Sequence, residues 1–276
     1  MELRYSTHPE HAKTFDTEQL REHYLIEELF VAGETKFVYS MEDRTVIGGV
    51  MPTEQGISLE ANEELKAEYF LERREVGIIN VGNSGKVVVD GQEYAMDSKD
   101  CLYVGKGNKE LVFTSDSASA PAKFYLFSAP AHTEYPIQKV SFKDIDGDQL
   151  GTKESANERV LSRMIHNNGI QSCQIVMGMT QLKAGSVWNS MPTHTHDRRM
   201  EAYLYIDLDE NARMFHMMGQ PNQTRHIVMK NEQAVISPPW SIHCGAATSN
   251  YTFVWAMAGE NKEFTDMDHV PMDQLR

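Results

Sequence analysis

Residues 86–96 read KVVVDGQEYAM, in which two short runs of strand-forming residues flank the pair Asp90-Gly91. Valine and tyrosine favour the extended, pleated conformation of a sheet. A two-residue connection of this kind commonly joins adjacent antiparallel strands, because Gly accepts the positive φ that a type I′ turn requires. The stretch therefore predicts a β-hairpin.

The same pattern continues on both sides of this hairpin, from about Phe37 onward. Short β-branched or aromatic runs are separated by Gly, Asp and Asn, as in VGIINVG (76–82), CLYVG (101–105), ELVFT (110–114) and AKFYLFSAP (122–130). This alternation of strand-forming runs with turn residues predicts an all-β fold, either an antiparallel sandwich or a barrel. One short helix is expected near the start, where Asp16 and Gln19 form a capping pattern ahead of Leu20 and Tyr24.

The chain is expected to consist of two related halves. A polar region at 139–157 separates two stretches that both read as strands. Similar strings recur in the same order in both halves. The pairs are FLERREVGII (70–79) with THDRRMEAYLYI (195–206), and DCLYVGKG (100–107) with QAVISPPW (233–240). The predicted division places residues 1–140 in one domain and residues 141–276 in the other.

Composition narrows the class of function. The net charge of -14 opposes binding to nucleic acid or to an anionic membrane surface, so a small solute is the expected partner. An anionic solute would need local Arg or Lys side chains. The only cysteines are Cys101, Cys173 and Cys244, without CxxC spacing, and no apolar run reaches the 18 residues or so of a membrane span. We therefore expect a soluble cytoplasmic protein with reduced thiols.

One group of residues has the side chains of a metal-binding site. The sequence GSVWNSMPTHTHDRRME (185–201) contains His194, His196 and Glu201, and PPWSIH (238–243) ends at His243. Residues i and i+2 of a strand face the same side, so both early histidines can point to one centre. Glu201 has the opposite parity, and a turn at residues 197–199 must bring it round from the next strand. Three imidazoles and a carboxylate suit Zn²⁺, Mn²⁺, Fe²⁺ or Ni²⁺, of which zinc is the first choice.

These residues also match a known pattern. The motif H-x-H-x4-E with a later P-x4-H resembles the metal motif of the cupin superfamily, although Gly185 lies further ahead of His194 than in the usual cupin pattern. Nearly from end to end, the chain is similar to the 5-keto-4-deoxyuronate isomerase family. The strings that carry this similarity are YFLERRE (69–75), LYVGKG (102–107), MPTHTHDRRME (191–201), FHMMGQP (215–221), TRHIVM (224–229), NEQAVISP (231–238) and WSIH (240–243).

The resemblance implies a bicupin, all-β fold with two antiparallel jelly-roll barrels, of which only the C-terminal one holds metal. It implies one zinc ion per subunit, bound by His194, His196, Glu201 and His243. The implied enzyme is an aldose–ketose isomerase that interconverts 5-dehydro-4-deoxy-D-glucuronate and 3-deoxy-D-glycero-2,5-hexodiulosonate in pectin degradation. The family resemblance further implies a homo-oligomer, typically a hexamer.

Isomerisation by this route would proceed through an enediolate, with one group moving a proton between two carbons. A carboxylate that binds metal is a poor base, so the expected candidates are other groups near the ligands: Tyr203, His216, His226 and Glu260. The sequence does not choose among them. A hydride shift between the carbons is the alternative.

The substrate's carboxylate needs a cationic partner. Arg198, Arg199, Arg225 and Lys230 lie close in sequence to the expected site strands, and Arg225 is favoured among them. Trp240 is a further candidate for contact with the sugar, although core packing is the commoner role of such a residue.

Two other functions compete with the isomerase. A cupin with the same ligands can bind Fe²⁺ and activate O₂ as a dioxygenase, which would show as iron-dependent oxygen uptake. Alternatively, the chain is a non-catalytic uronate-binding cupin whose metal is structural. Such a protein would bind a uronate without converting it.

Overall fold

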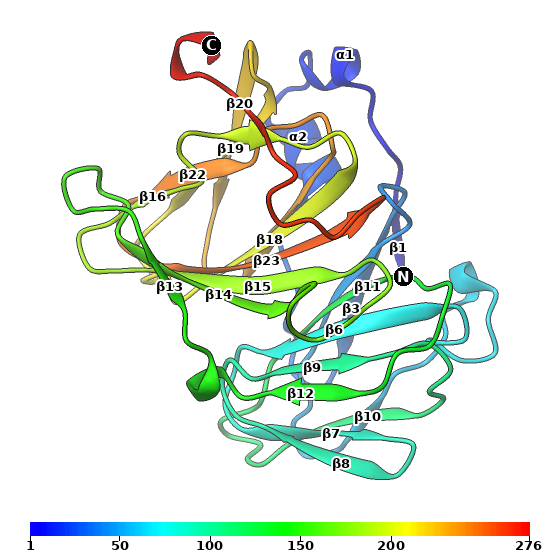
Figure 1. The fold of residues 1–276 in the computed structure, drawn as a ribbon. Helices are drawn as coiled ribbons and strands as arrows, with labels where there is room; N and C mark the ends of the chain where they lie inside the picture. Colours follow the sequence, from blue (N-terminus) through cyan, green and yellow to red (C-terminus); the bar gives the residue numbers. More distant parts are fainter. The chain divides into compact units, whose positions relative to one another are not determined.

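Strands make up most of the regular structure in the computed structural model, which describes residues 1–276. The chain divides into two compact units. Unit 1 consists of Met1–Arg4, Glu28–Ile145 and Met164–Val176, and unit 2 consists of Tyr5–Glu27, Asp146–Arg163 and Met177–Arg276. Each unit is thus assembled from three separate segments of the chain (Figure 1).

Unit 1 contains two sheets. The larger has seven strands in the order β1 (Glu2–Arg4), β3 (Thr35–Ser40), β4 (Val46–Val50), β11 (Phe124–Pro130), β6 (Arg74–Asn80), β9 (Cys101–Val104) and β12 (Gln138–Val140). The smaller has the order β5 (Ile57–Ser58), β10 (Leu111–Ser115), β7 (Gly85–Val89) and β8 (Gln92–Met96). Apart from the parallel pair β1–β3, neighbouring strands run antiparallel. Apolar side chains of both sheets form one core.

Unit 2 repeats this plan. Its larger sheet has the order β13 (Asp148–Leu150), β14 (Arg159–Ile165), β15 (Val176–Leu182), β23 (Thr252–Gly259), β18 (Arg199–Ile206), β21 (Gln233–Ser237) and β2 (Leu25–Ile26). Its smaller sheet has the order β16 (Trp188–Asn189), β22 (Cys244–Ala247), β19 (Met214–Gln220) and β20 (Gln223–Met229). A separate two-stranded pair joins β17 (His194–Thr195) to β24 (Asp268–His269).

The closed barrels expected from the sequence are not observed as continuous rings of hydrogen-bonded strands. In every sheet the first and last strands of the order are not hydrogen-bonded to each other. The short strands β5 and β16 are edge strands of the two four-stranded sheets. The molecule is mostly β, with each unit formed from a seven-stranded and a four-stranded sheet.

The hairpin expected at Asp90-Gly91 is confirmed. Strands β7 and β8 pair in antiparallel register with Val89 opposite Gln92. Asp90 has φ 46° and Gly91 has φ 84°, so both turn residues adopt the left-handed conformation that a type I′ turn requires.

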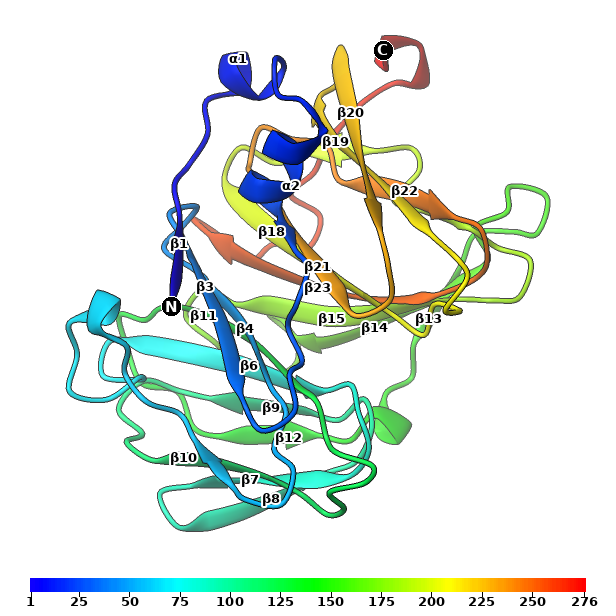
Figure 2. The ribbon, with the colours of Figure 1, turned by 180° about the vertical axis from the view of Figure 1, so that it is seen from behind.

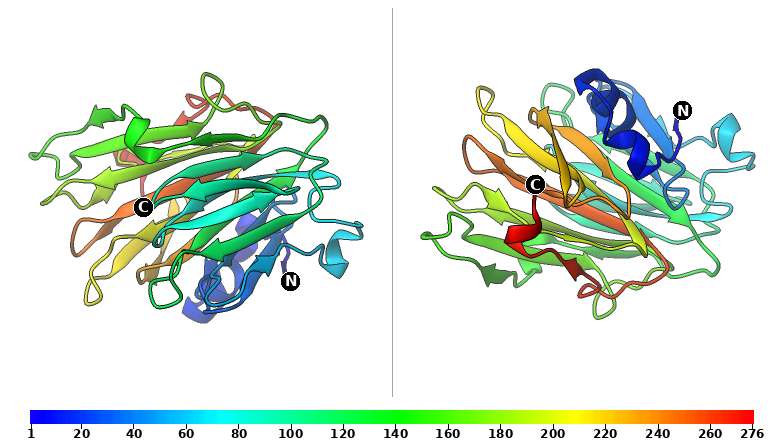
Figure 3. Two further views of the ribbon diagram at one scale, coloured as in Figure 1. Left: turned by 90° about the horizontal axis from the view of Figure 1, so that it is seen from below. Right: turned by 90° about the horizontal axis from the view of Figure 1, so that it is seen from above.

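The helices are few and short. Helix α1 (Pro9–Ala12) precedes helix α2 (Thr17–Tyr24), and one-turn 3₁₀ helices lie at Glu63–Leu65, Phe142–Asp144 and Met272–Gln274. The Asp16 side chain accepts from the Gln19 amide while the Gln19 side chain accepts from the Asp16 amide, which closes a capping box at the start of α2. Helix α2 contacts β20 and β21 within unit 2 (Figure 2, Figure 3). No helix is long and apolar enough to span a membrane.

The two units place similar sequences at the same point of the larger sheet. Strand β6 lies between β11 and β9, as β18 lies between β23 and β21. Both strands begin with a buried arginine, Arg74 and Arg199. The third residue of each strand differs, because Val76 in β6 stands where β18 has Glu201. The acidic side chain is therefore peculiar to unit 2 at this position.

Candidate metal centre

Four side chains from separate parts of unit 2 converge on one point. His194 lies on β17, His196 follows it, Glu201 lies on β18, and His243 lies between β21 and β22. The nitrogen and oxygen atoms that they offer all lie within 4.8 Å of one another, and all four residues are buried.

The chain achieves this convergence with one turn and one sheet pairing. Turn residues Asp197 and Arg198 separate β17 from β18, so Glu201 comes round on a new strand to the side of the histidines. Glu201 lies opposite Ser237 of the neighbouring strand β21, and the chain then passes through Pro238-Pro239 to His243.

The closest contacts join the ligand atoms themselves. The Nε2 atoms of His194 and His243 are 3.0 Å apart. One Glu201 carboxylate oxygen, Oε2, lies 2.9 Å from His243 Nε2 and 3.1 Å from His196 Nε2. Ligands of a tetrahedral ion at roughly 2.0–2.1 Å would be separated by about 3.3 Å, so this set fits a single divalent cation of the zinc type.

Neighbouring backbone carbonyls orient two of the rings. The Nδ1 atom of His196 is 2.8 Å from the Arg199 carbonyl, and Nδ1 of His243 is 3.3 Å from the Ser241 carbonyl. A proton on each Nδ1 would be donated to the carbonyl, which leaves Nε2 as the lone-pair atom that faces the centre. This is the arrangement that a metal-binding imidazole requires.

Burial and charge favour the metal-binding protonation states of His194 and Glu201, whereas the hydrogen bond and charge of Glu201 outweigh burial and raise the pKa of His196. Burial, with the nearby charge of His243, lowers the pKa of His194 to about 2, so this ring stays neutral. Burial alone would raise the pKa of Glu201, but His243 and His196 outweigh it through charge and hydrogen bonding, and the net pKa is lowered. A neutral imidazole and an ionised carboxylate are the forms that bind a cation.

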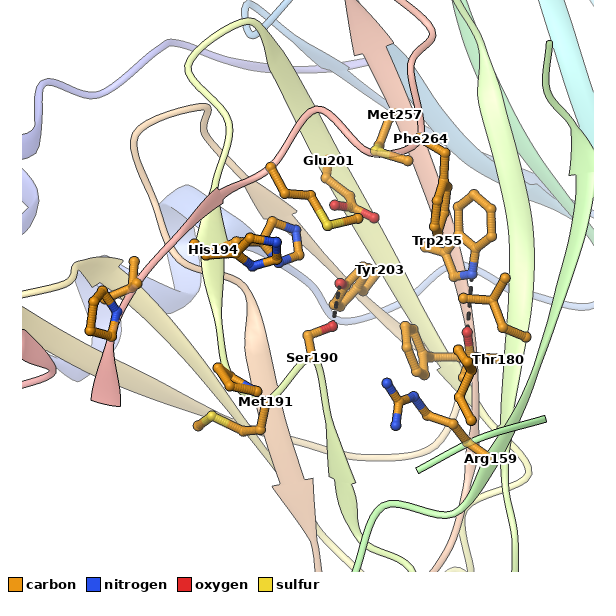
Figure 4. Close-up of a pocket in the computed structure, with 18 residues that line it drawn as sticks. Arg159, Thr180, Ser190, Met191, His194, Glu201, Tyr203, Trp255, Met257 and Phe264 are labelled. Carbon is orange, nitrogen blue, oxygen red and sulfur yellow. Dashed lines mark hydrogen bonds between the residues drawn. The ribbon is translucent and has the colours of Figure 1, made fainter. Parts of the chain in front are cut away.

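A pocket of about 560 Å³ opens beside this cluster (Figure 4). One wall is the inner face of the larger sheet, where alternate residues of each strand point inward, as with Glu201 and Tyr203 of β18. The opposite wall comes from the loop before β17 and from the C-terminal segment. The lining residues are Leu150, Arg159, Leu161, Thr180, Ser190, Met191, Pro192, His194, Glu201, Tyr203, Phe253, Trp255, Met257, Phe264, Met267, His269, Val270 and Pro271.

Tyr203 is the lining residue with a phenol group. Its hydroxyl lies 3.1 Å from Ser190 Oγ and 3.5 Å from the His243 carbonyl. Burial, reinforced by the charge of Glu201, raises the pKa of Tyr203 well above its usual value. The phenol therefore stays protonated at neutral pH and can donate a hydrogen bond into the pocket.

Comparison with known proteins identifies the relationship. The family model described as the KduI/IolB family matches residues 24–272. The chain belongs to the KduI/IolB family. A 4-deoxy-L-threo-5-hexosulose-uronate ketol-isomerase of Bacillus pumilus is 56% identical over 276 residues, and one of Bacillus subtilis is 54% identical over 276 residues. Each alignment covers 100% of both chains.

Among solved structures, an IolB-like protein of Salmonella typhimurium has a similar fold. The TM-score is 0.70 at 13% identity, with 90% of this chain and 96% of the other covered. The two chains thus share a fold at low sequence identity.

Several residues expected at the site lie elsewhere in this KduI/IolB chain. His226 is exposed on β20, with its ring near Phe215, and Glu260 is exposed just after β23. Arg225 donates to the Thr224 and Lys13 carbonyls, and it lines a separate small hollow with Trp240. Lys230 is exposed just after β20. None of these residues lines the pocket at the cluster.

The arginine pair beside the ligands is engaged with the C-terminal segment of the protein. Arg198 forms ion pairs with Asp266 at 2.7 Å and Asp268 at 2.6 Å. Arg199 is fully buried and donates to the Glu263 and Asp266 carbonyls, each at 2.8 Å. Both therefore hold the C-terminal segment that forms part of the pocket wall.

His216 is near the ligands but does not line the pocket. It is fully buried, and its Nδ1 lies 2.8 Å from the Tyr205 hydroxyl.

Two ionisable lining residues were not anticipated from the sequence, Arg159 and His269. Arg159 begins β14, and His269 lies on β24 directly opposite His194. No motif surrounds either residue. The only available signal was alternation along a strand, which places Arg159 and Leu161 on the same face.

Proposed function

We propose that this chain is a ketol-isomerase that interconverts 5-dehydro-4-deoxy-D-glucuronate and 3-deoxy-D-glycero-2,5-hexodiulosonate during pectin degradation. The observation that carries the proposal is the identity of 51–56% over essentially the whole chain to relatives that bear the ketol-isomerase name. The buried cluster beside a pocket of sugar-acid size supports it.

In this proposal His194, His196, Glu201 and His243 hold one zinc ion per chain. When bound, the ion would supply Lewis-acid chemistry, polarising the substrate's carbonyl and stabilising the enediolate. The protein's contribution is to hold three imidazoles and one carboxylate close together in a buried cluster.

The isomerisation neither adds nor removes atoms. A proton leaves C2 and one returns to C1, while the hydroxyl proton passes from O2 to O1. We infer that Tyr203 acts on the oxygens, because its protonated phenol faces the pocket. His269 is the other lining residue with suitable chemistry, since it is the imidazole of the pocket outside the four-residue cluster. We assign it the proton transfer between the carbons.

The finer architecture belongs to the same proposal. The two units would be two cupin barrels of the double-sheet, jelly-roll kind, with the expected boundary near residue 140 and the metal in the second. The matching strand orders of the two units support this interpretation. We also propose a cytoplasmic homohexamer, with the three free cysteines consistent with a reducing compartment. Light scattering on the purified protein tests the hexamer.

The central experiment combines turnover with elemental analysis. Purified protein is expected to contain about one zinc per chain and to convert the unsaturated uronate released by a pectate lyase. In D₂O, proton transfer would place solvent deuterium at C1 of the ketose, whereas a hydride shift would leave that carbon unlabelled. Iron-dependent oxygen uptake without isomerisation would instead indicate a dioxygenase.

A ligand variant completes this test. Glu201→Gln removes the only carboxylate of the cluster. Loss of an outer partner of a metal ligand costs about 10–100-fold in affinity or activity, and loss of a direct ligand should cost at least as much. Wild-type zinc content in Glu201→Gln would contradict the assigned ligand set.

A further inference from the structure

Arg159 is the only arginine or lysine that lines the pocket at the metal cluster. It occupies the first position of β14, and its side chain extends from the sheet with the guanidinium group directed toward the middle of the pocket (Figure 4). Arg159 and the cluster residue Glu201 stand on the same inner face of the larger sheet. The pocket thus carries one fixed positive charge of its own.

This guanidinium has no acidic partner. Its one hydrogen bond is donated by Nη1 to the Asn157 carbonyl at 2.9 Å, and it takes part in no ion pair. The side chain is half-buried, and burial lowers its pKa below the usual value for arginine. Partly buried charges are normally paired, so the unpaired donors call for an anion supplied by a ligand.

Other arginines of unit 2 show the contrast. Arg163 is paired with Asp148, and Arg198 is paired with Asp266 and Asp268. Arg199 donates through both terminal nitrogens to backbone carbonyls and does not line the pocket. Among these, only Arg159 combines a position in the pocket with free donor groups.

Arg159 and the cluster lie at different places around one pocket. Strand β14 is three strands from β18 in the larger sheet, and Arg159, His194 and Glu201 all line the pocket. An open-chain hexosulose uronate has its reacting aldehyde at one end and its carboxylate at the other. With the reacting end at the cluster, the carboxylate would extend toward β14.

We propose that Arg159 binds the substrate's carboxylate and thereby makes the pocket selective for sugar acids over neutral sugars. This inference rests on the proposed function, since it assigns the opposite end of the same substrate. Leu161, Phe253 and Trp255 also line the pocket, and such apolar surroundings strengthen a charge-assisted pair.

The test measures binding as well as turnover. Calorimetry would give the dissociation constants of D-glucuronate and D-glucose for the wild type, Arg159→Met and Arg213→Met. Arg213 is the matched control, because it donates to the Glu210 and Ala212 carbonyls and does not line the pocket. We expect Arg159→Met to reduce the preference for glucuronate over glucose by about 10- to 150-fold, and Arg213→Met to preserve it.

The outcomes separate this inference from the proposed function. An unchanged preference in Arg159→Met, or a wild type without any preference for glucuronate, would overturn the role of Arg159. If the methionine variant does not fold, Arg159→Gln removes the same charge but keeps a polar side chain. The preference for glucuronate over glucose is then measured with that variant. A wild type that prefers glucuronate but converts no unsaturated uronate would refute the isomerase while leaving the carboxylate site supported.

Discussion

At the scale of single residues, His216 couples stability to pH. Burial, reinforced by the charge of His243, lowers the pKa of His216 to about 3. An unfolded histidine takes up its proton near pH 6.5, so the unfolded state gains protons first as the pH falls. Stability from this residue is therefore fully present above about pH 6.5 and is lost progressively toward pH 3.

Replacing His216 removes this dependence. In His216→Gln, the free energy of unfolding should fall less steeply between about pH 6 and 4, by up to about 1.4 kcal/mol per pH unit for one proton. Urea titrations of metal-free protein at several pH values would measure the slope without a contribution from metal release. Identical slopes in the two proteins would show that another group is responsible.

The sequence could predict which residues meet at the cluster but not what surrounds them. His194, His196 and Glu201 lie within eight residues, so strand parity and one turn are enough to bring them together. Arg159 reaches the pocket only because β14 lies three strands from β18 in the sheet, an order that no local pattern encodes. Arg225 is the opposite case, a residue expected at the site that lies outside the pocket. Its strand β20 belongs to the other sheet, and the Arg225 guanidinium donates to the Lys13 carbonyl.

At the scale of elements, the C-terminal segment is a wall of the pocket held by Arg199. This fully buried side chain donates to the Glu263 and Asp266 carbonyls, and the segment contributes Phe264 and His269 to the lining. Arg199→Met should lower the free energy of unfolding by about 1–3 kcal/mol, because the carbonyls of Glu263 and Asp266 lose their charged donors and a buried side chain is replaced. It should also raise KM as the wall loosens, which steady-state kinetics would measure.

Arg198 provides the control for this prediction. Its ion pairs with Asp266 and Asp268 are partly exposed, and exposed pairs contribute little. Arg198→Met should therefore have the smaller effect on both stability and KM. Equal effects of the two substitutions would argue against a special role for the buried arginine.

The strand pattern and the turn residues predicted individual strands and turns. They did not predict the order in which the strands lie in each sheet. The β7–β8 hairpin follows directly from Asp90-Gly91, because two residues with positive φ leave few alternatives. The sequence could not indicate that β2, only two residues long, would end the larger sheet of unit 2, because so short a strand has no periodicity of its own.

At the scale of the whole molecule, Glu75 ties the segment Met164–Val176 into unit 1. Its buried carboxylate accepts from the Tyr103 hydroxyl at 2.7 Å. It also accepts from three successive backbone amides, those of Cys173 at 2.6 Å, Gln174 at 2.7 Å and Ile175 at 3.0 Å. One charged group thus anchors a stretch of chain about 100 residues away in sequence.

Glu75→Gln should release this segment. The amide has one acceptor oxygen in place of two and lacks the charge, so we expect the free energy of unfolding of unit 1 to fall by at least about 2 kcal/mol. Hydrogen exchange at the amides of residues 173–175 should accelerate. Glu93→Gln is the matched control, because Glu93 forms only an exposed pair with Lys86. Unchanged protection at those amides would contradict the anchoring role.

The pairing of β2 with β21 affects how the protein is made. Leu25 lies opposite Val235, about 210 residues further along the chain. At a synthesis rate of roughly 5–20 residues per second, β2 leaves the ribosome about 10–40 s before its partner exists. A newly made, apolar Leu25-Ile26 pair must wait through the translation of about three quarters of the polypeptide before β21 can pair with it.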